Sequence, residues 1–516
     1  MTTDRRGWRE IAEGIVRPPS PALAKAFGLC AVSLSVVVGI VLFSRHTTLS
    51  GPGDQLSYYS QARKLLPFTD HYYGPGYFVA LRVVRDLLNT DWLTAAKTVS
   101  FVSTFGVLVV SAFLFRAVLG NNLGWLALGL LALTPDLIGQ MYTDLTIPFG
   151  AVWLLAAIAA TVGATVDNRR RWITAALLFG LASLVRFQSF GFLLGTVLGI
   201  AFLPGTWRSR IGTAALVLVV GILPTVAWKV FLVLTQGSAP ANWNFIALTM
   251  GSGEFREFTD VPSLLGKYGS FLGLVRADPL LIPKLVVHAG METIRFPLGV
   301  GAQMLGPAVL WLGPGLIAGL FDRRFWSPWA MALTVGFLIT APTQPGWTHY
   351  FVPMLPLLIV LLIWGVELPD RSTRPALVAV GWLALIGATL LWSAHRVPLN
   401  FDANDWSEQS VAKEYLNRGD ARSRIVASTA ATISYGGRFR FIDFDRIRRG
   451  RDGVDIAADL RRAGVTHLVV TARHSLFQYP AQAVLLADSL AMVPDGLVRD
   501  TLIVYPQRLA IFRVLP

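Results

Sequence analysis

The chain has 516 residues, of which 53% are hydrophobic and only 15% charged, and its mean hydropathy is +0.54. Soluble domains carry about 25% charged residues, so this composition excludes an ordinary soluble protein and predicts a polytopic α-helical membrane protein. The net charge of +14 does not indicate a nucleic-acid partner, because the basic residues lie in short clusters between apolar runs, as the positive-inside rule describes.

The first apolar run, from about Pro21 to Phe43, is too long for the hydrophobic part of a cleavable signal peptide. We therefore expect a signal anchor that follows a cytoplasmic segment, residues 1–20. The run contains Cys30, the single cysteine, which excludes an internal disulfide and a thiolate metal site. An outer loop of about fifty residues, 45–93, comes next. Its Asp54 stands just beyond the run, and a carboxylate at this place suggests a reaction at the membrane surface.

Residues 75–90 of this loop could be mistaken for a further membrane span. Arg82, Arg85 and Asp86 lie on one side of such a helix and apolar residues on the other, which favours an amphipathic helix at the interface. Excluding it also keeps the arginine clusters cytoplasmic. A span needs about twenty apolar residues, and the runs that reach or approach this length predict about eleven membrane helices: 22–44, 94–116, 120–138, 145–166, 171–186, 188–204, 211–235, 298–321, 327–342, 350–367 and 375–394.

Four further residues at the predicted outer face are candidates for a site. Asp144 ends the outer turn 139–144, and Arg186 lies between two apolar runs. Ionisable residues at membrane depth usually face a partner or a cavity, although Arg186 could also snorkel to the interface. His349 and Tyr350 begin an outer-leaflet span, where a capping or interfacial role remains the alternative.

The last outer segments are a loop at 236–297 and a tail that begins near His395, where continuous hydropathy gives way to alternation. The predicted domains are thus 1–20, the membrane module 21–395, and a small extracytoplasmic α/β domain, 396–516. Within the tail we expect a helix at 407–417 with Ser407 as N-cap, a helix at 453–463, and strands at 424–428, 439–443, 466–471, 501–505 and 509–514.

These residue types fit the transfer of a sugar to a hydroxyl group. That reaction needs a carboxylate to accept the proton of the acceptor and positive charge, or a metal, beside the leaving phosphate. Asp54 and Asp144 are the candidate carboxylates, although each could be a helix cap or a solvated loop residue. The chain has no Walker-type phosphate loop, so ATP-driven transport is unsupported.

Four short motifs stand at the ends of predicted spans: Gly53-Asp54-Gln55-Leu56-Ser57-Tyr58-Tyr59, Tyr73-Gly74-Pro75-Gly76-Tyr77-Phe78, Thr143-Asp144-Leu145-Thr146-Ile147-Pro148, and Gly180-Leu181-Ala182 continuing to Arg186. Together they resemble the GT-C superfamily of membrane glycosyltransferases, and within it the protein O-mannosyltransferases and the aminoarabinose transferases of lipid A. The chain departs from the family pattern at Gln55, where a second acid is usual. The motif from Tyr73 to Phe78 stands where the family has a Pro-Pro-Leu helix start, and the lysine often found after that element is absent here.

The resemblance implies an inverting transferase with a polyprenyl-phosphate sugar donor and an active site facing away from the cytoplasm. Asp54 would be the base and Asp144 would lie across the same cavity. The donor phosphate would contact Arg186, with His349 and Tyr350 nearby. No cofactor is certain, and a divalent metal ion stays open. The acceptor would be a hydroxyl of a glycan, lipid or protein.

Two other functions remain alternatives. A transporter or flippase of a lipid-linked glycan would need polar or broken helices near the midplane, and Pro224 with Lys229 in one span is the main feature of this kind. A catalytically silent GT-C-like scaffold is the other.

Overall fold

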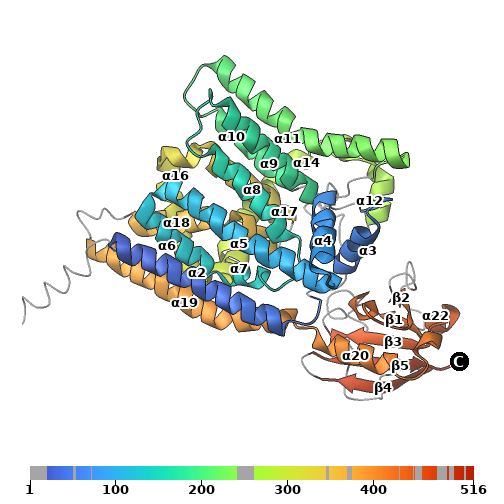
Figure 1. The fold of residues 1–516 in the computed structure, drawn as a ribbon. Coiled ribbons are helices and arrows are strands. Elements are labelled where there is room, and N and C mark those ends of the chain that lie inside the picture. The colour runs from blue at the N-terminus through green and yellow to red at the C-terminus, as the bar shows by residue number, and fades with distance from the viewer. Residues whose placement is uncertain are drawn as a thin grey trace, which may run out of the picture. The chain divides into compact units, whose positions relative to one another are not determined.

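The computed structural model describes residues 20–49, 54–70, 73–186, 188–240, 261–343, 348–368, 375–428, 431–444, 447, 456–472, 485–486, 493–504 and 507–516. Internal contacts divide the chain into two units (Figure 1). The first takes in Met1–Phe43 with Lys64–Asn400, and the second Ser44–Arg63 with Phe401–Pro516. The predicted domain boundaries remain predictions.

The first unit is built of helices. Up to residue 236 they are α2 (Pro21–Arg45), α4 (Pro75–Leu88), α5 (Trp92–Leu119), α6 (Asn121–Ala132), α7 (Pro135–Gln140), α8 (Ile147–Thr161), α9 (Arg169–Val185), α10 (Ser189–Ile200) and α11 (Trp207–Gln236). The later ones are α12 (Val261–Tyr268), α13 (Phe271–Ala277), α14 (Leu281–Arg295), α15 (Val300–Leu305), α16 (Leu312–Phe321), α17 (Pro328–Thr343), α18 (Leu355–Glu367) and α19 (Pro375–Asn404), with short 3-10 helices η3 to η6 between them.

Six helices of the described residues are long and apolar enough to cross a membrane: Pro21–Arg45, Trp92–Leu119, Trp207–Gln236, Val286–Phe321, Thr348–Glu367 and Ala376–Asn417. Three shorter apolar helices, Ile147–Thr161, Ser189–Ile200 and Pro328–Ala341, fall below that length. The chain is therefore a mostly helical membrane protein, whereas the predicted count of eleven spans is not confirmed. Residues 75–88 do form the separate helix α4, and its interfacial position stays a prediction.

Helices of the first unit pack closely where small residues meet a neighbouring backbone. α5, α8, α9 and α11 contact one another in that order (Figure 1), and α10 packs on α17 as α16 does on α18. A side chain at Gly195 would collide with the carbonyl oxygen of Met331, and one at Gly315 with that of Leu361. Such glycine faces let membrane helices approach.

The second unit contains α3 (Asp54–Lys64), α20 (Ser407–Asn417), α22 (Ile456–Arg462) and a five-stranded sheet. The strands are β1 (Ile425–Ser428), β2 (Arg440–Asp443), β3 (His467–Thr471), β4 (Leu497–Ile503) and β5 (Leu509–Val514), in the order β2-β1-β3-β5-β4. β1 pairs in parallel with β2 and β3, and β5 pairs antiparallel with β3 and β4.

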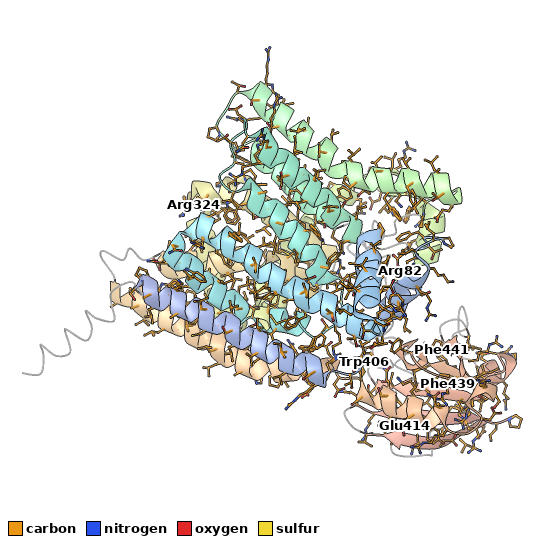
Figure 2. All side chains as sticks on the ribbon, viewed as in Figure 1. Arg82, Arg324, Trp406, Glu414, Phe439 and Phe441 are labelled. Atoms are coloured by element: carbon orange, nitrogen blue, oxygen red, sulfur yellow. The ribbon has the colours of Figure 1, made fainter. Side chains whose placement is uncertain are left out.

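Alternate residues of the strands face opposite sides of this sheet, as strand geometry requires. Leu468 and Phe512 pack with Leu460 of α22, whereas Val469 and Ile511 pack with Leu416 of α20. Phe439 and Phe441, which flank Arg440 at the start of β2, belong to the α20 side (Figure 2).

The secondary structure predicted for the tail is close to that observed. Each predicted strand has a counterpart, and α20 has the predicted bounds 407–417. The expected cap is wrong, because the N-cap position of α20 is Trp406 and its side chain makes no capping bond. The Ser407 amide instead donates to Oδ1 of Asp405 at 3.0 Å, so the aspartate two residues before the helix satisfies it.

Candidate functional site

Arg186 lies in the short break between α9 and α10. Its backbone is extended, with φ −142° and ψ 123°, so it ends α9. That extended segment forms an isolated antiparallel bridge with Tyr73, the residue before Gly74. Gly74 can lie against this break only because it has no side chain, since a Cβ there would collide with the carbonyl oxygen of Leu184. The motif that begins at Tyr73 and the motif that ends at Arg186 are thus in direct backbone contact.

The guanidinium of Arg186 contacts the neighbouring Gln188 and three residues that are distant in the chain. Nε donates to Oε1 of Gln188 at 3.1 Å and Nη1 donates to Oγ1 of Thr146 at 3.2 Å. The guanidinium carbon lies 4.7 Å from the ring centre of Tyr350 and 5.5 Å from that of Tyr73, within the range of cation–π attraction. These four partners have neutral side chains, and they orient the guanidinium.

Arg186 borders a small hollow whose other lining is largely apolar. The polar members of the lining are Gln188, Ser189, Thr340 and Tyr350. The remaining lining residues are Ile147, Gly150, Ala151, Leu154, Phe192, Pro353 and Met354. An apolar hollow with a few converging polar groups is typical of a small-molecule site, and here the fixed charge at its edge is positive.

His349 and Tyr350 lie in η6 (Thr348–Met354), and their rings are 4.5 Å apart. Tyr350 contacts Arg186 directly, and His349 is close enough to sense its charge. The three residues predicted to meet a donor phosphate therefore lie together. Their role in binding stays a prediction.

Asp144 is completely buried, in the segment between α7 and α8. Its charge acts on Tyr77 of α4 and Lys97 of α5. Burial raises the pKa of the Tyr77 phenol, and Asp144 raises it further. Asp144 is not among the residues that line the hollow. It is tied to Arg186 through the chain, because Thr146 follows it by two residues and accepts the bond from Arg186.

Asp54 begins α3, and its side chain lies outside the described residues. A chamber shared by Asp54 and Asp144 accordingly stays a prediction. The helix itself is well packed, with Tyr58 and Tyr59 buried. The Tyr59 ring lies 5.7 Å from that of Tyr435, which belongs to the same unit.

Several polar residues near this site are not among the candidates derived from the sequence. Lys97 is buried, and its Nζ donates to the carbonyl oxygen of Phe43 at 2.6 Å. Asp136 of α7 is buried, hydrogen-bonds with Thr348, and senses the charge of Arg396. The sequence does contain a signal for Lys97 and Asp136, because both are ionisable residues inside predicted apolar runs, where charge is costly and usually functional.

The described residues contain no group of three or more His, Cys, Asp or Glu side chains arranged to hold a metal ion. Asp70 accepts a hydrogen bond from the Tyr73 amide at 2.7 Å. The side chain of Asp54 and the whole of His71 lie outside the described residues. Binding of a divalent ion by the first loop therefore stays a prediction.

No family model and no curated protein matches the chain, but solved structures do. The apo oligosaccharyltransferase of Archaeoglobus fulgidus aligns over 92% of this chain and 73% of its own, at 13% identity and a TM-score of 0.57. Apo ArnT from Cupriavidus metallidurans aligns over 94% of this chain and 97% of its own, at 14% identity and a TM-score of 0.55. ArnT bound to undecaprenyl phosphate gives 15% identity and a TM-score of 0.51. The chain thus has the fold of the GT-C membrane glycosyltransferases, which confirms the resemblance.

Proposed function

We propose that this protein transfers a sugar from a polyprenyl-phosphate donor to an acceptor hydroxyl at the extracytoplasmic face of the cell membrane. The observation that carries the proposal is the buried Arg186, which is held between two tyrosines at the edge of an apolar hollow. Two structures of the same fold support it, because one is ArnT bound to undecaprenyl phosphate and the other an archaeal oligosaccharyltransferase bound to a dolichol-phosphate.

In this proposal Arg186 binds the phosphate of the donor. A guanidinium offers two parallel N–H donors to phosphate oxygens, and its positive charge offsets the negative charge that grows on the leaving group. Tyr350 and His349 complete this side of the site. The apolar lining of the hollow receives the first part of the prenyl chain, which would be unfavourable in water.

The acceptor reacts from the opposite face of the sugar. Its oxygen forms a bond to the anomeric carbon while the bond from that carbon to the phosphate oxygen breaks, so the configuration inverts. The phosphate leaves with the bonding electron pair, and the hydroxyl proton passes to a carboxylate. Asp54 is the proposed base, and Asp144 is proposed to lie across the same cavity. A divalent ion at the first loop would supply additional positive charge beside the phosphate.

The experiment that tests this proposal measures sugar transfer in membranes that contain wild-type protein or the Asp54→Asn variant. Removing a general base lowers the rate by roughly a hundredfold or more. Asp86→Asn is the matched control, because Asp86 is an exposed carboxylate on α4. Wild-type turnover by Asp54→Asn contradicts the base role.

A vesicle assay separates transfer from transport. Transfer predicts that sugar leaves a labelled donor and appears on an acceptor. Movement of the intact labelled lipid across the bilayer, without sugar release, contradicts the transferase proposal and supports a flippase. We place the N-terminus in the cytoplasm and the tail outside, which protease accessibility of residues 396–516 in sealed vesicles would test.

A further inference from the structure

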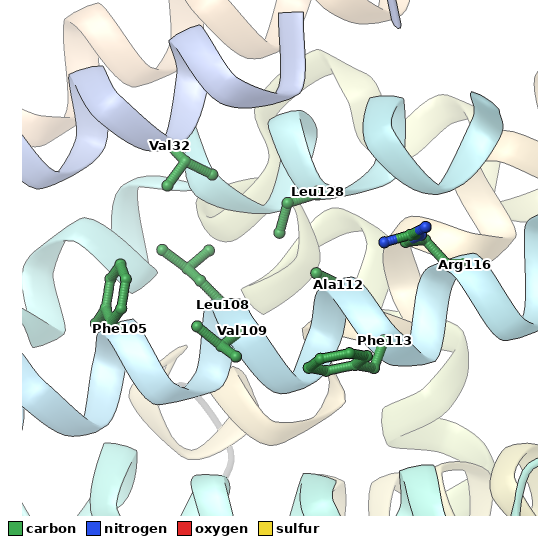
Figure 3. Close-up of a pocket in the computed structure, with 8 residues that line it drawn as sticks. All are labelled: Val32, Phe105, Leu108, Val109, Ala112, Phe113, Arg116 and Leu128. Atoms are coloured by element: carbon green, nitrogen blue, oxygen red, sulfur yellow. The ribbon is translucent and has the colours of Figure 1, made fainter. Parts of the chain in front are cut away.

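A second hollow lies among α2, α5 and α6 (Figure 3), and Arg186 is not among its lining residues. Its volume is about 190 Å³. Seven of its eight lining residues are apolar, and the eighth is Arg116 near the end of α5 (Figure 3). The apolar residues are Val32, Phe105, Leu108, Val109, Ala112, Phe113 and Leu128.

Close helix contacts fix the sides of this hollow. A Cβ at Gly28 of α2 would lie 2.6 Å from the carbonyl oxygen of Trp125, and one at Gly124 would lie 3.0 Å from the Cα of Arg116. α6 is therefore pressed against both α2 and α5, and Leu128, one turn beyond Trp125, lies between them. The hollow thus follows from the close packing of these three helices.

Arg116 places a positive charge at one end of this apolar groove. Its guanidinium carbon lies 5.9 Å from the ring centre of Trp125, and its side chain is exposed. Within the described part of the chain, Arg116 takes part in no ion pair. The positive-inside rule places the end of α5 at the cytoplasmic surface, opposite to the predicted side of Arg186.

We propose that this groove binds one anionic phospholipid of the cytoplasmic leaflet. The phosphate lies at Arg116, and one acyl chain follows α5 past Ala112 towards Phe105. An apolar groove that ends in a single cation matches an amphiphile with a negative head and a hydrocarbon chain. Basic pockets between membrane helices on the cytoplasmic side bind anionic head groups, and arginine is suited to phosphate. The proposal does not depend on the transferase activity.

Two observations favour a lipid over a protein partner. Phe105 and Phe113 on this part of α5 are 46% and 65% exposed, and they belong to a helix apolar enough to cross a membrane. Such a surface faces hydrocarbon, where lipid is the surrounding solvent and apolar burial provides no drive for helix association. The positive charge of Arg116 at the end of the groove then favours lipids with a negatively charged head group.

The test is native mass spectrometry of purified protein mixed with phosphatidylglycerol or with phosphatidylcholine of the same acyl chains. We expect one phosphatidylglycerol molecule to be retained in preference to phosphatidylcholine. Arg116→Gln should lower this retention about fivefold, which is the typical effect of one basic residue at an anionic membrane surface. Ala112→Phe fills the groove without changing charge and should also lower it.

Arg208→Gln is the matched control, because Arg208 is exposed on the same predicted side but does not line the groove. Thermal unfolding of each variant identifies general loss of structure, and the comparison uses variants that unfold within a few degrees of wild type. Equal retention of the two lipids overturns the proposal, as does unchanged retention by Arg116→Gln or an equal loss in Arg208→Gln. Preferential retention of added undecaprenyl phosphate at this groove also overturns it.

Discussion

Arg186 donates from Nη1 to Oγ1 of Thr146 at 3.2 Å, although the two residues are 40 positions apart in the chain. Thr146 precedes α8 and follows Asp144 by two residues. One bond therefore connects the cation of the hollow to the segment that carries the buried carboxylate. Movement of either segment would disturb the other.

The first prediction concerns this bond. Thr146→Val keeps the shape of the side chain but removes the acceptor, so one guanidinium N–H loses its partner. The net contribution of one hydrogen bond is about 1 kcal/mol. Because this energy corresponds to a factor of about five in rate, we expect sugar transfer to slow about fivefold. Thr235→Val in α11 is the control, because Thr235 is exposed and bonds only within its own helix. Equal slowing in both variants would count against a specific role.

The second prediction concerns the charge of Arg186 itself. Arg186→Lys keeps one positive charge but loses the planar pair of donors and the stacking on Tyr73 and Tyr350, so we expect roughly a tenfold loss of kcat/KM for the lipid donor. Arg186→Gln should lower kcat/KM further, because it also removes the positive charge. Arg82→Lys, an exposed substitution on α4, serves as control. Kinetics at varied donor concentration distinguish weaker binding from slower chemistry, and a normal rate in Arg186→Gln would refute phosphate binding.

Asp144 and Lys97 provide a third prediction, because both are buried and their charges interact. Asp144→Asn removes the negative charge that stabilises the buried ammonium group of Lys97. Lys97→Met removes the positive charge that stabilises the buried carboxylate of Asp144. We expect each single variant to unfold at a lower temperature than wild type, and the double variant to lose less than the sum. A coupling of about 1 kcal/mol is typical of interacting neighbours. Strictly additive losses would show that the two charges act independently.

Much of the fold could be derived from the sequence, since hydropathy and charge placement are strong signals in membrane proteins. Alternation of apolar residues located the strands of the tail, and the charges of 75–90 separated α4 from the spans. The predicted count of eleven spans is not confirmed, because six helices of the described residues reach the length of a span. Ser189–Ile200 is apolar but shorter than a membrane span needs, whereas the break at Arg186 lies where the sequence predicts the boundary between two apolar runs.

The candidate site was recoverable only in part. The sequence identified Arg186, His349 and Tyr350 one by one, but their proximity depends on a tertiary contact between the break after α9 and η6. Thr146 and Gln188 were missed because a hydroxyl or an amide near a helix end ordinarily satisfies backbone groups. Lys97 and Asp136 were missed because they lie inside apolar runs, whereas the candidates derived from the sequence lie at the ends of the runs, although charge within such a run is itself informative.

The fourth prediction concerns pH and the sheet of the second unit. Burial, and then the charge of Arg424, lower the pKa of His467 in β3, while Asp500 opposes this and Arg513 reinforces it. Nδ1 of His467 lies 2.9 Å from Oγ1 of Thr466. Because the folded pKa is below the unfolded value of about 6.5, the unfolded chain binds more protons and acid favours unfolding.

We therefore expect the stability of this unit to be complete above about pH 6.5 and to fall as the pH drops from there towards the folded pKa. His467→Asn should flatten the dependence in that window. Near-UV circular dichroism during thermal unfolding at stepped pH would measure it, with His395→Asn in α19 as the control. A decline of unchanged slope in His467→Asn would assign the effect to other groups.

The last prediction concerns how the first loop is held. The Trp406 amide donates to Oγ1 of Thr48 at 3.1 Å, and Nε2 of His46 lies 2.8 Å from the carbonyl oxygen of Asn404. The ring of Tyr59 in α3 lies 5.7 Å from that of Tyr435, with 55° between the ring planes. All six residues belong to the second unit. His46, Thr48 and Tyr59 of the first loop therefore contact residues more than 350 positions later in the chain, and the contact of Tyr59 with Tyr435 involves α3 itself.

If that packing positions Asp54, weakening it should impair transfer without touching the reacting groups. Tyr435→Ala removes one ring of a pair worth about 1 kcal/mol, so amide hydrogen exchange over residues 54–64 should become roughly fivefold faster, and kcat should fall more than donor KM rises. Tyr435→Phe retains the ring and should behave as wild type. Faster exchange with unchanged kcat would separate the order of α3 from catalysis. Unchanged exchange in Tyr435→Ala would show that contacts other than Tyr435 hold α3 in place, and would contradict this prediction.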